Sequence, residues 1–149
     1  MCNISVKVSF SFQYFKHPIF GNFSIESVID YVVSNKGNEN VILKCVTISF
    51  CGKTIKTPYG IANGLAEEKR FYPQKFPKEL KPNSELSGNF LIENVLKSIG
   101  NQLKDTDFIQ VTVWDKNGNK YDSEVFTIQA MKNQFIAQKM VNEKSKKGI

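Results

Sequence analysis

The stretch that decides the fold runs from Phe108 to Ile128 and reads FIQVTVWDKNGNKYDSEVFTI. Apolar residues alternate with polar ones on both sides of the polar segment DKNGNK. Such alternation is typical of β-strands with one buried face. Asn-Gly is the strongest short hairpin signal, because both residues accept a positive φ. The sequence therefore predicts a hairpin of strands 107–114 and 120–128, with Asn117 and Gly118 at the centre of its turn.

The same polar segment has a second interpretation, a calcium loop. Asp115, Asn117 and Asn119 alternate as the ligands of an EF-hand loop do. Counted from Asp115, however, the sixth residue is Lys120 and the twelfth is Phe126, where such a loop requires Gly and a bidentate Glu. The mismatch favours a turn, and we expect no metal site there.

Outward from the hairpin, the chain contains further strand patterns. Residues 4–12 and 24–34 alternate with period two, and each indicates a strand with one solvated face. Residues 41–51 are almost continuously apolar or β-branched, so we expect a central strand buried on both faces. Residues 54–57 and 86–92 complete the set of clear strands.

One short helix is expected before the final hairpin. Within residues 93–103, the side chains of Val95, Leu96, Ile99 and Leu103 follow the spacing of one helical face. Strands at intervals of about ten residues with a single short helix indicate an all-β protein built from two packed sheets. We expect one such domain over residues 1–128 and a basic, partly helical tail over residues 129–149.

In this rhythm the chain resembles immunoglobulin-like β-sandwiches over roughly residues 4–128. The resemblance rests on the run VILKCVTISFC at residues 41–51 and on the final hairpin VTVWDKNGNKYDSEVFTI. It implies a two-sheet sandwich with a helical crossover before the last two strands. No cysteine follows Trp114, so the Cys–Trp–Cys signature of antibody domains is absent from the sequence.

The composition favours a non-catalytic role. His17 is the single histidine, and any Ser–His or Cys–His pair would have to use it. None of the nucleotide, phosphate, zinc or nucleophile-elbow motifs occurs. We expect no enzyme activity and no cofactor. Three cysteines without metal-ligand spacing fit a reducing compartment, and we expect a cytoplasmic protein.

Two aromatic loops are the first candidate contact site. FQYFKHPIFGNF and RFYPQKFP, at residues 12–23 and 70–77, are dense in rings. Rings that do not close the ends of the sandwich would form an exposed apolar patch, which normally marks a contact site. The candidate residues for a protein partner are Phe15, Phe20, Phe23, Phe71, Tyr72 and Phe76.

The tail is the second candidate. Residues 129–149 hold five lysines and one glutamate, a net +4 of the chain's +6. Met131, Phe135, Ile136 and Met140 lie at helical spacing and could dock on the domain, fill a partner's groove or lie on an anionic membrane. We favour docking as far as Met140. Lys139, Lys144, Lys146 and Lys147 are the candidate contacts to nucleic acid or an anionic surface.

The function expected from the sequence is therefore a protein–protein interaction module that uses the aromatic loops and the C-terminal helix, with Met131, Phe135 and Met140 as helix contacts. The alternative is a binder of nucleic acid or anionic membrane through the basic tail. A hydrolase ranks third.

Overall fold

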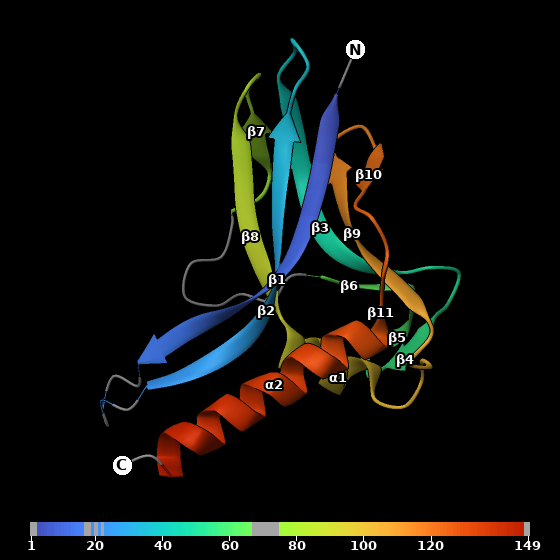
Figure 1. The fold of residues 1–149 in the computed structure, drawn as a ribbon. Helices are drawn as coiled ribbons and strands as arrows, with labels where there is room; N and C mark the ends of the chain where they lie inside the picture. The colour runs from blue at the N-terminus through green and yellow to red at the C-terminus, as the bar shows by residue number, and fades with distance from the viewer. Residues whose placement is uncertain (1–2, 17–18, 20, 22, 67–74, 148–149) are drawn as a thin grey trace.

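The computed structural model describes residues 3–16, 19, 21, 23–66 and 75–147, with the backbone alone at 15, 16, 23 and 145–147. The described residues form a mainly β protein of antiparallel sheets with two helices (Figure 1). The elements in chain order are β1 Ile4–Lys16, β2 Phe23–Asn35, β3 Val41–Phe50, β4 Ile55–Thr57, β5 Gly60–Ala62, β6 Gly64–Ala66, β7 Lys78–Leu80, β8 Glu85–Leu91, α1 Ile92–Ile99, β9 Phe108–Asp115, β10 Lys120–Asp122, β11 Phe126–Thr127 and α2 Ile128–Lys147.

The first sheet has the order β1-β2-β8. β1 and β2 are 13 residues each and pair without interruption from Ile4↔Asn35 to Lys16↔Phe23. β8 accompanies β2 from Ser34 only as far as Val28. Residues 12–16 and 23–27 therefore project beyond β8 as a two-stranded ribbon, which we call the arm and which Figure 1 shows above α2.

The second sheet has the order β10-β9-β3-β6, with β11 also paired to β9 and β7 to β3, while β4 and β5 form a separate pair. Its central strand β3 corrects the expectation of burial on both faces, because buried and accessible residues alternate along it. The reason lies on the outer face, which is polar: Ser49 Oγ donates to Thr112 Oγ1 at 2.8 Å, and that hydroxyl donates to Asp122 Oδ1 at 2.7 Å. Hydroxyls that bond one another tolerate partial solvation.

The two larger sheets share one apolar core. Tyr31 of β2, Ile48 of β3 and Val111 of β9 are each 0% exposed and belong to a single cluster. Tyr31 pairs across the first sheet with Gly88 of β8, and any Cβ at Gly88 would overlap the Tyr31 hydroxyl and ring. A glycine is needed there because the aromatic ring occupies the space of a side chain.

The short helix is confirmed, although it ends earlier than predicted. α1 ends at Ile99 because Gly100 adopts a φ of 57° and donates its N–H to the carbonyl of Leu96. With a ψ of −128°, Gly100 has a positive-φ conformation that glycine adopts without a Cβ penalty. Leu103 follows the helix and is still buried.

The predicted turn is present, with a different geometry. Of the two central residues only Gly118 has a positive φ, 85°, and the Gly118 N–H donates to the carbonyl of Asp115 at 3.2 Å. Asp115 and Asn119 then close the loop through a backbone bond of 2.9 Å. This is the three-residue hairpin loop with glycine in the αL position. The predicted second strand 120–128 is interrupted at 123–125, and its last residue, Ile128, begins α2.

The buried Asp115 carboxylate explains why the polar segment is a turn. It accepts hydrogen bonds from the backbone N–H groups of Asn117 and Asn119, from the Asn119 side chain and from the Tyr121 hydroxyl, at 2.9–3.0 Å. Burial by itself raises the pKa of Asp115, but these hydrogen bonds outweigh it and hold the pKa below its ordinary value. The carboxylate thus organises its own loop.

Candidate interaction surface

The edges of the arm differ in how their backbone groups are satisfied. In β2, Asn35 directs its N–H and C=O toward residues 83 and 84, on the β8 side. Backbone groups alternate along a strand, so the N–H and C=O groups of the odd-numbered residues of β2 point toward β8. Those of the even-numbered residues bond to β1. In the arm, where β8 has ended, the groups of Ile25 and Ser27 would therefore be without a strand partner.

Helix α2 supplies the missing partners with its side-chain amides. Asn142 accepts from the Ile25 N–H at 3.0 Å and donates to the Ile25 carbonyl at 3.1 Å. Gln138 accepts from the Ser27 N–H at 2.6 Å, and the Ser27 hydroxyl donates to the Gln134 carbonyl at 3.0 Å. We call this set of contacts the amide lock. In the amide lock, side chains of α2 take the place of a neighbouring strand. The β2 edge of the arm is therefore covered by the helix.

The start of α2 is anchored by apolar burial. Ile128 and Met131 are 1% and 0% exposed, and Phe135 packs against the same core. Fully burying a side chain of this size stabilises a protein by roughly 1.5–3 kcal/mol before the entropy of ordering is subtracted. The helix therefore docks through apolar side chains at its first turn and through amides further along.

The opposite face of α2 is accessible. Ile136 and Met140 are 54% and 55% exposed, and Val141 is 42% exposed. Lys139 lies beside them, with its Nζ 4.6 Å from the centroid of the Phe135 ring, a cation–π distance. Lys132 forms an ion pair with Asp105, and Lys144 is exposed.

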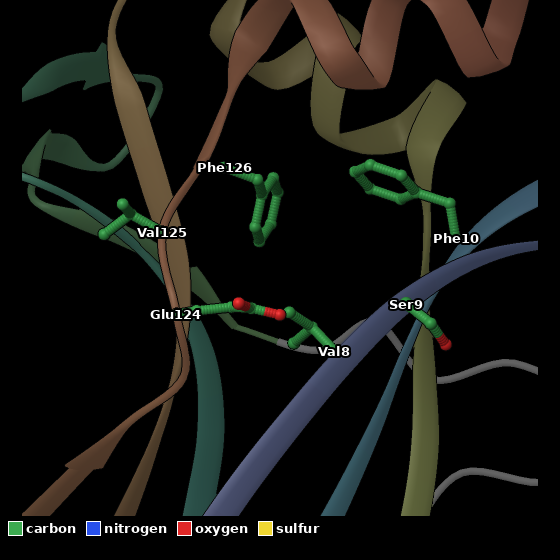
Figure 2. A pocket seen from close by; sticks show the side chains of 6 residues that line it. All are labelled: Val8, Ser9, Phe10, Glu124, Val125 and Phe126. Carbon is green, nitrogen blue, oxygen red and sulfur yellow. The ribbon is translucent and has the colours of Figure 1, made fainter.

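A hollow lies between β1 and the segment that joins β10 to β11 (Figure 2). Its volume is about 130 Å³, and it is lined by Val8, Ser9, Phe10, Glu124, Val125 and Phe126. The rings of Phe10 and Phe126 meet edge to face at 5.4 Å between centroids. Apolar cavities of about 150 Å³ accept a benzene-sized molecule, so the hollow has room for one apolar side chain.

The predicted site residues divide into several groups. Phe20, Phe71 and Tyr72 lie outside the described residues, as do the side chains of Phe15, Phe23, Lys146 and Lys147. Phe76 is partly buried against the core. Met131 is buried and Phe135 half-buried, while Met140, Lys139 and Lys144 are accessible. The helical spacing of the tail was thus predicted, but the stripe is split between two faces.

Several residues of this surface were not singled out by sequence reasoning. Phe12 and Tyr14 lie in a stretch expected to be a loop but belong to β1. They are 40% and 82% exposed although they continue the alternation of buried residues in that strand. Gln138 and Asn142 form the amide lock from a stretch that reads as solvated. Trp114 is half-buried and donates from Nε1 to Thr47 Oγ1 at 3.2 Å on the outer polar face. No local signal identifies them, because each depends on where β8 ends or which sheet face is covered.

Of the side chains singled out for possible chemistry, His17 lies outside the described residues, and the pKa values of the two described cysteines are raised. Burial raises the pKa of the Cys45 thiol, and burial together with Asp122 raises that of Cys51. Both shifts lower the thiolate fraction that a nucleophile or a metal ligand needs. Among the described residues, no group of three or more His, Cys, Asp or Glu side chains has the geometry of a metal site.

Comparison with known proteins leaves the chain without an assigned family: no protein-family model matches it, and no curated protein shows significant similarity. Neither helix, over the residues the structure describes, is both long and apolar enough to span a bilayer.

Proposed function

We propose that the protein is a non-catalytic protein-binding module whose contact surface is the outer face of α2. The observation that supports this most directly is the pair Ile136 and Met140, one helical turn apart and each more than half exposed. Residues four apart on a helix form a continuous surface, and exposed apolar surface is where protein partners bind.

The docked half of α2 supports the same proposal. Its inner face is held by Met131 and by the amide lock, so the helix is ordered before any partner arrives. A pre-ordered helix loses little conformational entropy on binding. An amphipathic helix that presents apolar anchors one turn apart is a common recognition mode.

For the fold itself, we propose an immunoglobulin-like arrangement of the two larger sheets. It is supported by their shared core and by the position of α1 between β8 of the first sheet and β9 of the second. This arrangement places α2 at one end of the sheets, beside the arm (Figure 1).

The test is capture of a partner by the purified full-length protein at low and high salt, using two double variants. Ile136→Ser with Met140→Ser removes apolar surface without changing charge. Lys139→Gln with Lys144→Gln removes charge and keeps the apolar surface. We expect a partner that resists salt and is lost only with the serine variant, because apolar contacts are not screened.

The opposite result would reject the proposal. Binding that disappears at high salt and with the glutamine variant, but survives the serine variant, would instead support a binder of nucleic acid or anionic membrane. The melting temperature of both variants serves as the folding control.

A further inference from the structure

The second edge of the arm, formed by β1, has no counterpart of the amide lock. Since the odd-numbered residues of β1 bond to β2, the N–H and C=O groups of Phe12 and Tyr14 in the arm, and of Val8 and Phe10 just before it, point away from the sheet. Within the described part of the chain, no hydrogen bond from another segment reaches these groups. One edge of the arm is thus closed by α2 and the other is open.

Within the arm, the open edge also lacks the devices that normally prevent pairing with another chain. Natural edge strands are short, bulged, or interrupted by proline and inward-facing charge. β1 is 13 residues long, pairs with β2 without a bulge, and contains no proline. Between Lys7 and Lys16 its sequence is VSFSFQYF, which carries no charge.

We propose that this edge pairs with the same edge of a second copy of the chain, antiparallel and with the two-fold axis at Phe12. In that register Phe12 faces Phe12 of the second copy and Phe10 faces Tyr14. All of these residues direct their backbone groups outward, as a hydrogen-bonded antiparallel pair requires. The two three-stranded sheets then become one six-stranded sheet.

Charge and shape both favour a second copy as the occupant. The register places Tyr14 of the second copy beside Phe10, at the hollow of Figure 2, which has room for an apolar side chain. It also places Lys16 of the second copy opposite Val8, on the rim that carries Glu124. Glu124 has no ion-pair partner among the described residues, and a lysine at that register position supplies the opposite charge.

The exposure of the aromatic residues fits the same pairing. Tyr14 is 82% and Phe12 is 40% exposed, whereas Ile25, which faces Tyr14 across the arm, is buried beneath α2. Pairing would cover the two rings that the helix leaves open. This dimer surface lies on β1 and is separate from Ile136 and Met140, so it does not rest on the protein-binding role proposed above.

The experiment is sedimentation velocity of the full-length protein from about 1 µM to 1 mM, the range in which a modest interface dissociates. We expect the mass to rise with concentration from 17.0 kDa toward twice that value. Phe12→Lys and Phe12→Glu each place like charges opposite one another at the two-fold axis. Each alone should weaken dimerisation by at least about tenfold, and an equimolar mixture of the two should restore it.

Gln13→Lys is the matched control, since the same charge then faces Ser11 of the second copy on the other face of the strand. It should leave dimerisation within about twofold of the wild type. A protein that stays monomeric throughout, a dimer that both Phe12 variants leave intact, or a mixture that dimerises no better than either variant alone would each overturn the proposal. Restoration in the mixture would also show that the variants fold.

Discussion

Two methionines on one helix test how α2 is held. Met131 is fully buried, whereas Met140, nine residues later, is 55% exposed. Nine residues at 3.6 per turn place them on opposite faces of the helix. Replacing each by alanine removes the same atoms and improves helix propensity equally, so the difference between the two variants isolates burial.

We expect Met131→Ala to lower the free energy of unfolding by about 2–5 kcal/mol, the range for truncation of a buried methionine. Met140→Ala should change it by no more than about 0.5 kcal/mol, as is usual at the surface. For a chain of this size each kcal/mol corresponds to about 2–4 °C in Tm. Met131→Ala should therefore melt about 4–20 °C below Met140→Ala.

Urea unfolding followed by circular dichroism measures both variants, with the slope m as a check that the unfolding transition keeps the same extent. Equal stabilities would refute the docked helix, because a tail that waits undocked for a partner exposes both methionines alike. A loss confined to Met131→Ala, with m unchanged, would support docking in the isolated protein.

Three further predictions concern the sheets and the final hairpin. Gly118→Val should lower the free energy of unfolding by roughly 1 kcal/mol or more, because a β-branched residue must adopt the φ of 85°. Added calcium should leave the wild-type Tm unchanged, and a calcium-dependent rise in Tm would contradict a turn that binds no metal. Gly88→Ala should cost about 1–3 kcal/mol in urea unfolding, since its Cβ overlaps the Tyr31 ring, and a neutral result would mean that the ring does not cover this glycine. The folded pKa of Asp115 lies below its unfolded value of about 3.9, so the stabilisation from this carboxylate is present above that pH and lost as pH falls through the folded pKa. Asp115→Asn should therefore flatten the pH dependence of the free energy of unfolding below about pH 4. Equal pH dependence in the variant and the wild type would argue against the carboxylate network.

The local parts of the fold were predictable from the sequence, because alternation and turn chemistry act over a few residues. The strand at residues 4–12, the presence of a helix within residues 93–103 and the turn at Gly118 all follow from such patterns. The continuous apolar run of β3 misled because its polar positions, Thr47 and Ser49, are β-compatible and bond to each other, to the Thr112 hydroxyl and to the Trp114 indole N–H.

The interaction surface was less predictable, since it depends on contacts between distant segments. Which face of α2 turns inward is decided by the unpaired groups of Ile25 and Ser27, more than 100 positions earlier in the chain. Tyr14 is exposed on the part of β1 that projects beyond the end of β8 at Leu91. Neither fact has a signature in the residues themselves.

The amide lock has a kinetic consequence. Asn142 and Ile25 are separated by 117 positions, and contacts of such sequence separation form only after a large closure entropy has been overcome. We therefore expect them to be absent from the transition state for folding. Interactions of that kind leave the folding rate almost unchanged and slow unfolding. The amide lock would then set how long the arm stays closed against α2. Replacing Asn142 with a residue that cannot form these hydrogen bonds would speed unfolding without slowing folding.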